Sequence, residues 1–175
     1  MSKTVIKFGL NTTDINRAIR EVNKFKQDFR NKVDTYRKRI ADEIAVQASL
    51  NFGSSVVDDV INGSPRRPDV SVSVSNRGDI AVIIADGEDA VWCEFGAGVY
   101  HNGSVGSSPH PNGSNLGFTI GSYGKGYGKK QAWGYYDESG ELVITRGTPA
   151  TMPLYNAAQE VMRKSVEIAR EVFGS

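Results

Sequence analysis

Apolar residues recur at steps of three and four through the first third of the chain, which predicts one long α-helix. Such spacing places one buried stripe on a helix, and here the stripe consists of Ile15, Ile19, Val22, Phe25, Phe29, Val33, Tyr36, Ile40, Ile44 and Ala48. Thr12, Thr13 and Asp14 precede it and carry side-chain oxygens that suit a helix N-terminus. A helix over residues 14–52 would extend for roughly 58 Å at about 1.5 Å per residue. Because that exceeds the diameter of a domain of this size, we expect part of the helix to overhang or to meet a neighbour.

The apolar pattern after Gly53 predicts strands. Valines alternate with serines over residues 70–75, as in a half-buried strand, and residues 80–85 are a continuous apolar run, as in a strand buried on both faces. The run Ala90–Phe95 predicts a further strand, so that residues 70–95 contribute one part of a sheet. Residues 132–146 read as a hairpin that adds two more strands. Short turns between neighbouring strands favour antiparallel pairing.

A helix over residues 152–173 is predicted to close the domain. Pro153 suits a first helical turn, and the inner face consists of Leu154, Ala158, Val161, Ile168 and Val172. The predicted fold class is therefore α+β in a single domain, with the long N-terminal helix and the C-terminal helix packed on a mainly antiparallel sheet. Residues 1–13 form an arm in this interpretation, and residues 96–131 form a long glycine-rich loop.

Composition limits the possible partners and the cellular compartment of the chain. The chain has 175 residues and a net charge of +1, which gives no global electrostatic reason to expect a nucleic-acid or membrane partner. It lacks the apolar run of a transmembrane helix and the apolar core of a secretory signal. Cys93 is the only cysteine, which excludes an internal disulfide and fits a reducing compartment such as a cytoplasm. The modest apolar content predicts no large exposed apolar face, and hence a chain that is monomeric or weakly oligomeric in isolation.

Candidate chemistry is sparse. Cys93 and His110 resemble a thiol nucleophile and its base, but Cys93 lies in an apolar run beside the acid Glu94, where a free cysteine is usually a small buried hydrophobe. His101 and His110 match no helical pair of metal ligands and lack a compact set of carboxylates. A structural or interface role is the better hypothesis for both histidines. We expect no catalytic residue, no metal site and no cofactor.

The glycine-rich loop carries the candidate interface. Its segment 121–130 mixes glycine, tyrosine and lysine but fails the spacing of a phosphate-binding loop, since Thr119 and Tyr123 stand where glycine is required. Tyrosines can stack and lysines can pair with phosphate or with carboxylates. The residues predicted to contact a partner are Tyr100, Phe118, Tyr123, Lys125, Tyr127, Lys129 and Lys130. An alternative interpretation is a nucleic-acid-binding accessory protein that uses this loop together with the basic face of the long helix.

Four phrases of the sequence carry a resemblance to a known family. They are Trp92-Cys93-Glu94-Phe95-Gly96, then Pro109-His110-Pro111 in the long loop, Trp133-Gly134-Tyr135-Tyr136-Asp137, and the stretch from Thr145 to Tyr155. With the long basic helix before them, these phrases resemble the tail-completion proteins of long-tailed bacteriophages, which join tail to head and are also called minor tail or neck proteins.

The resemblance implies an α+β structural subunit of the virion with no enzymatic activity. Its copies are expected to form a homo-oligomeric, six-fold ring at the head-proximal end of the tail, after assembly in the cytoplasm of the host bacterium. The implied partners are a head-completion or stopper protein on one side and the tail tube protein on the other, with genomic DNA passing through the centre and no membrane involved. The loop from Gly98 to Lys130 is expected to be ordered by these partners.

Overall fold

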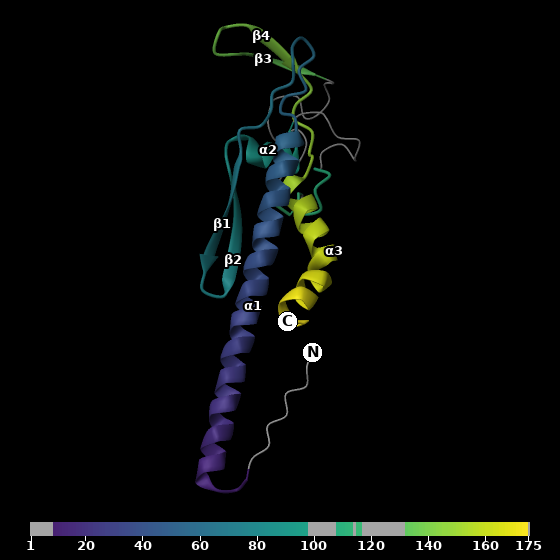
Figure 1. Ribbon diagram of the computed structural model, residues 1–175. Coiled ribbons are helices and arrows are strands. Elements are labelled where there is room, and N and C mark those ends of the chain that lie inside the picture. The colour runs from purple at the N-terminus through teal and green to yellow at the C-terminus, as the bar shows by residue number, and fades with distance from the viewer. Residues whose placement is uncertain (1–8, 98–107, 114, 117–131, 175) are drawn as a thin grey trace.

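The chain forms an elongated α+β structure in which a single long helix extends over most of the length of the molecule (Figure 1). The computed structural model describes residues 9–97, 108–113, 115–116 and 132–174. Within them the elements are α1 (Thr12–Ser54), β1 (Ser71–Arg77), β2 (Ile80–Asp86), α2 (Asp89–Phe95), β3 (Trp133–Tyr136), β4 (Leu142–Thr145) and α3 (Pro153–Gly174). Helix α3 lies beside the middle and upper part of α1, and β1 and β2 run along α1 as well (Figure 1).

Helix α1 confirms the periodicity argument and its consequence. It contains 43 residues, which at about 1.5 Å per residue is roughly 64 Å, and its N-terminal part projects well beyond the end of α3 (Figure 1). The cap is Asn11, whose side chain accepts a hydrogen bond from the Asp14 amide at 2.8 Å. The capping oxygen therefore comes from one residue before the threonines named above.

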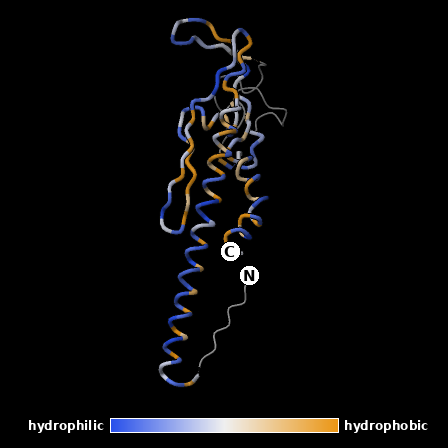
Figure 2. The backbone as a smooth tube through the Cα atoms, in the orientation of Figure 1, coloured by the Kyte–Doolittle hydropathy of each residue, from blue (hydrophilic) through white to orange (hydrophobic). Residues whose placement is uncertain are grey.

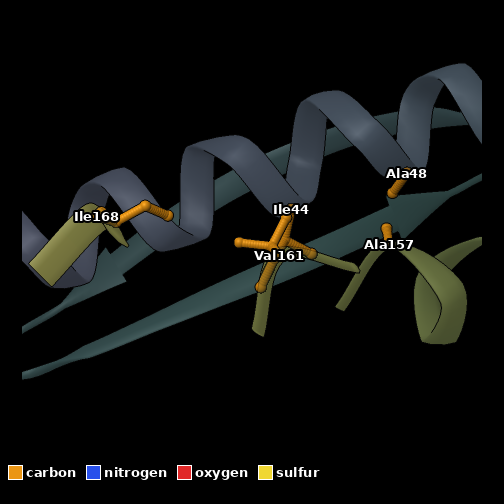
Figure 3. Close-up of a cluster of buried hydrophobic side chains, with 5 residues drawn as sticks. All are labelled: Ile44, Ala48, Ala157, Val161 and Ile168. Atoms are coloured by element: carbon orange, nitrogen blue, oxygen red, sulfur yellow. The ribbon is translucent and has the colours of Figure 1, made fainter. Parts of the chain in front are cut away.

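The core lies where α1 and α3 pack together. Figure 3 shows Ala48 opposite Ala157 and Ile44 opposite Val161, with Ile168 further along. Ala48 and Ala157 are completely buried, and two such small side chains let the helix backbones approach closely. At the lower end of this contact, the rings of Phe29 and Phe173 lie 5.9 Å apart.

Strands β1 and β2 form an antiparallel hairpin whose inner face packs on α1. Val72 and Ile83 pack against the helix core, while Arg37 of α1 donates a hydrogen bond to the carbonyl of Gly78 in the hairpin turn. The other face of β2 is exposed at Ile80, Val82 and Ile84. The expectation that residues 80–85 are buried on both faces is therefore wrong, because only the inner face has a helix against it among the described residues.

The apolar run after the hairpin is a helix, α2, and not the predicted strand. Its buried residues are Asp89, Ala90, Cys93 and Glu94, a spacing that follows the helical period of 3.6 and not the period of 2. The turn before α2 requires Gly87, which has φ of 140°. A Cβ atom at this position would lie 2.2 Å from the carbonyl oxygen of Asp69.

Strands β3 and β4 form a second antiparallel hairpin at the far end of the molecule from the N-terminus of α1 (Figure 1). The predicted single sheet is thus two separate two-stranded sheets in the part of the chain that the structure describes. The segment after α1 anchors this hairpin, since Val60 forms a bridge with Thr145 and the Tyr135 hydroxyl donates to the Asp58 carboxylate at 3.0 Å. The β3–β4 hairpin therefore projects beyond the end of α1 and is held by contacts with the segment that follows this helix (Figure 1).

Candidate functional site

The start of helix α3 is capped by a side chain from another helix. The Glu94 carboxylate of α2 accepts hydrogen bonds from the amides of Leu154 at 2.8 Å and of Tyr155 at 2.9 Å. The first amides of a helix lack partners within the helix, and a carboxylate there also interacts favourably with the helix dipole. Met152, which precedes α3, has a positive φ of 52°. Glu94 thus fixes the point at which the chain turns into α3.

His110 lies against the same carboxylate. Its Nε2 is 3.2 Å from Oε1 of Glu94, and the side chains of His110 and Glu94 are only 6% and 7% exposed. The Asn112 amide donates to Nδ1 at 3.0 Å, which leaves Nε2 as the nitrogen that carries the proton and donates to Glu94. The ring also contacts the rings of Phe95 and Tyr155 at centroid distances of 4.6 and 5.2 Å.

Backbone contacts complete this cluster. The Cys93 carbonyl accepts hydrogen bonds from the amides of Thr151 and Met152, and Ala97 and Thr148 exchange two backbone hydrogen bonds at 2.8 and 3.0 Å. These contacts connect three segments into one hydrogen-bonded unit, which consists of residues 93–97, His110 and residues 148–155. We call it the α3 capping cluster.

The geometry argues against the thiol–imidazole pair considered in the sequence. Both ring nitrogens of His110 are engaged, one with Glu94 and one with the Asn112 amide. Cys93 is completely buried, and that burial raises the pKa of its thiol to about 11. A thiol with so high a pKa holds its proton at neutral pH and is a poor nucleophile. Cys93 and His110 serve as packing and hydrogen-bonding residues.

A second buried acid organises the neighbouring end of α2. The Arg66 guanidinium donates two hydrogen bonds to Asp89, at 2.7 and 2.9 Å, and the Asp69 amide donates a third at 3.0 Å. Burial raises the pKa of Asp89, but the bonds from Arg66 and from the Asp69 amide outweigh it, so the pKa lies below its ordinary value. Asp89 is therefore a buried and paired acid, although the neighbouring Glu88 is exposed.

The predicted interface of the glycine-rich loop lies outside the described residues. This holds for Tyr100, Phe118, Tyr123, Lys125, Tyr127, Lys129 and Lys130, and also for His101. Among the residues that are described, no three metal-ligating side chains come together. Within the same part of the chain, no helix has the length and apolar character needed to cross a membrane.

The structure reveals two apolar surfaces that sequence reasoning did not locate. The first lies on the overhang of α1, which we define as residues 12–33 and along which apolar residues recur (Figure 2). The large apolar side chains of this segment are exposed. The second is the outer face of the β1–β2 hairpin, where Ile80, Val82 and Ile84 stand exposed. The expectation that the chain has no large exposed apolar face is therefore wrong.

Comparison with known proteins identifies no relative of this chain. No protein-family model matches the chain, and neither a curated protein nor a solved structure shows significant similarity to it.

Proposed function

We propose that the chain is a structural virion protein that completes the tail of a long-tailed bacteriophage and joins it to the head. In this proposal its copies form a six-fold ring at the head-proximal end of the tail. The ring contacts a stopper protein on the head side and the tube protein on the tail side, and genomic DNA passes through its centre. The protein acts by binding and carries out no chemical reaction.

The observation that supports this proposal best is the α3 capping cluster. Three phrases that carry the resemblance are far apart in the sequence, yet they contribute Glu94, His110 and the start of α3 to one buried unit. Because these residues contact one another, they form a single structural element. The resemblance thus involves a connected part of the fold and not three isolated matches.

The shape of the molecule also supports an assembly role. Helix α1 extends far past its own core (Figure 1), and its apolar stripe continues to Ile15 with side chains such as Phe25 that are 55% exposed. A large exposed apolar surface on a protein commonly marks a binding site for another protein. A subunit that functions within a larger assembly has a physical reason to keep such a surface.

A second candidate function is that of a nucleic-acid-binding accessory protein. It is favoured by the overhang, which contains six cations against three acids. The acids are interspersed along the same segment, however, and Asp14 forms an ion pair with Arg17 at 2.8 Å, which weakens any continuous basic surface.

The two candidates differ in what the purified chain binds. If it completes tails, it should dock on the ends of purified tails that lack it, as seen by negative-stain electron microscopy, and bind duplex DNA weakly. If it is an accessory protein, it should bind duplex DNA with an affinity that falls steeply with salt, by a slope of about −0.9 per phosphate contacted, and should ignore the tails. Strong salt-dependent DNA binding without tail docking would overturn the proposal.

A further inference from the structure

The apolar stripe on the overhang of α1 is exposed except at Ala18, which is buried, and its C-terminal end at Phe29 meets the ring of Phe173. Helix α3 ends near Phe29, where Phe173 makes its last ring contact with α1. Six large apolar residues on this side remain exposed, namely Ile15, Ile19, Val22, Phe25, Phe29 and Val33. They continue the row that further along α1 packs against α3, so the stripe has the geometry of a helix-packing face.

The charge next to this stripe is positive. The overhang carries Arg17, Arg20, Lys24, Lys26, Arg30 and Lys32 against Asp14, Glu21 and Asp28, a net charge of +3. At 100° per residue, Lys26 and Arg30 fall on the same side of the helix as Val22 and Phe29. Two overhangs placed face to face would therefore bring like charges together, which disfavours symmetric pairing of this surface with itself.

The outer face of the β1–β2 hairpin has the opposite character. Ile80, Val82 and Ile84 form an apolar row along β2, and Ile80 is 64% exposed. Around it residues 69–88 carry Asp69, Asp79, Asp86 and Glu88 against Arg77, a net charge of −3. All five of these charged residues are exposed. The inner face of the hairpin already packs on a helix of its own chain, so a helix on the outer face would complete a three-layer arrangement.

The two surfaces also match in length. Each strand of the hairpin has seven residues, about 23 Å at roughly 3.3 Å per residue. The segment from Ile19 to Val33 is about 21 Å long at roughly 1.5 Å per residue. Both surfaces belong to rigid secondary structure, so binding them together costs little ordering of the backbone.

We propose that the overhang of α1 in one copy packs on the outer face of the β1–β2 hairpin in the next copy. Two different surfaces meet in such a contact, so it is heterologous, and it builds a closed ring when the rotation between copies closes. For its biological setting this inference rests on the proposed function, to which it adds the contact between subunits. The partner is a second copy of this chain, recognised by apolar packing and opposite charge.

Charge reversal provides the test, because all the residues to be substituted are exposed. Lys26→Glu with Arg30→Glu makes a helix variant, and Asp79→Lys with Asp86→Lys makes a hairpin variant. Sedimentation velocity over a concentration series at low salt should show self-association of the wild-type chain and at least a tenfold weaker association of each variant. A chain with all four substitutions should associate again. The matched control, Arg163→Glu with Arg170→Glu on the exposed side of α3, should behave like the wild type.

Three results would overturn the proposal. The first is a wild-type chain that stays monomeric with a dissociation constant weaker than about 1 mM. The second is a hairpin variant that associates as strongly as the wild type, which would indicate pairing of overhangs. The third is a four-substitution chain that associates no better than the two variants.

Cross-linking gives an independent measurement that does not depend on charge. Two chains of different mass are mixed, one with Val22→Cys on the overhang and one with Val82→Cys on the hairpin, while Cys93 stays buried. The proposal expects mixed disulfide dimers, and exclusive overhang-to-overhang dimers would contradict it. A ring seen on tails without this cross-link would remove the contact but keep the proposed function. Conversely, a chain that associates through these surfaces but does not dock on tails would remove the proposed function but keep the contact.

Discussion

Removing the Glu94 carboxylate should destabilise the protein through the N-terminus of α3. In Glu94→Ala the amides of Leu154 and Tyr155 lose their acceptor, and the Nε2 proton of His110 loses its partner. A buried donor left without a partner costs about 1–3 kcal/mol, and loss of a helix cap costs about 0.5–2 kcal/mol. Because these terms overlap, we expect a total loss of about 3–4 kcal/mol. For a chain of this size that lowers the melting temperature by roughly 6–16 °C.

Urea unfolding followed by circular dichroism measures this loss directly. The matched control is Glu88→Ala, which removes an exposed acid from the N-cap of α2, where its side chain makes no capping hydrogen bond, and should change stability by at most about 0.5 kcal/mol. Glu94→Gln keeps one carbonyl oxygen as an acceptor and should fall between the two. If Glu94→Ala were no more destabilising than Glu88→Ala, the capping role assigned to Glu94 would be refuted.

Three further predictions concern other parts of the core. Asp89→Asn should lower the free energy of unfolding by about 1–2 kcal/mol at pH 7. This loss is smaller than that expected for breaking a fully buried ion pair, because the Arg66 side chain is 55% exposed. Since the folded pKa of Asp89 lies below its ordinary value of 3.8, its contribution is complete above that pH and is lost as the pH falls through the folded pKa. The stability difference between the wild type and this variant should therefore shrink in acid unfolding experiments, and a difference that grows below that pH would contradict the assignment. Cys93→Ala should cost about 1–2 kcal/mol in urea unfolding and leave particle infectivity intact, whereas loss of infectivity with the fold preserved would restore a chemical role for the thiol. Ala157→Leu should force α3 away from Ala48, where both side chains are completely buried, and cost about 1–3 kcal/mol, while Ala158→Leu, at a partly buried position, should cost less.

The long helices could be predicted from the sequence because their signal is local and extended. The apolar stripe of α1 fixes its type over many turns, and the predicted ends at residues 14 and 52 differ by two residues from the observed Thr12 and Ser54. Helix α3 runs from Pro153 to Gly174, one residue from the prediction at each end. In contrast, the apolar run at residues 90–95 is too short for its length to distinguish a strand from a helix.

The α3 capping cluster could not be predicted because it depends on contacts between distant parts of the chain. Nothing near Glu94 in the sequence indicates that its carboxylate meets the amides of Leu154 and Tyr155. Asp89 and Glu94 are buried together with Ala90 and Cys93, and the helical spacing of these four residues is the only sequence signal of their burial. Interpreting the segment as a strand places them on opposite faces and removes that signal. The length of the predicted helix indicated that part of it overhangs, but not which part, since a sequence pattern shows that a helix has an apolar face and not which element covers it.

The most direct test of the central claim is a head–tail joining assay in a lysate. Infection by a phage in which this chain is disrupted should yield filled heads and free tails, counted separately by electron microscopy. Adding the purified chain should convert them into joined, infectious particles, with the chain located at the junction by gold labelling. Normal numbers of joined particles without the chain, or purified chain that leaves heads and tails apart, would contradict the account.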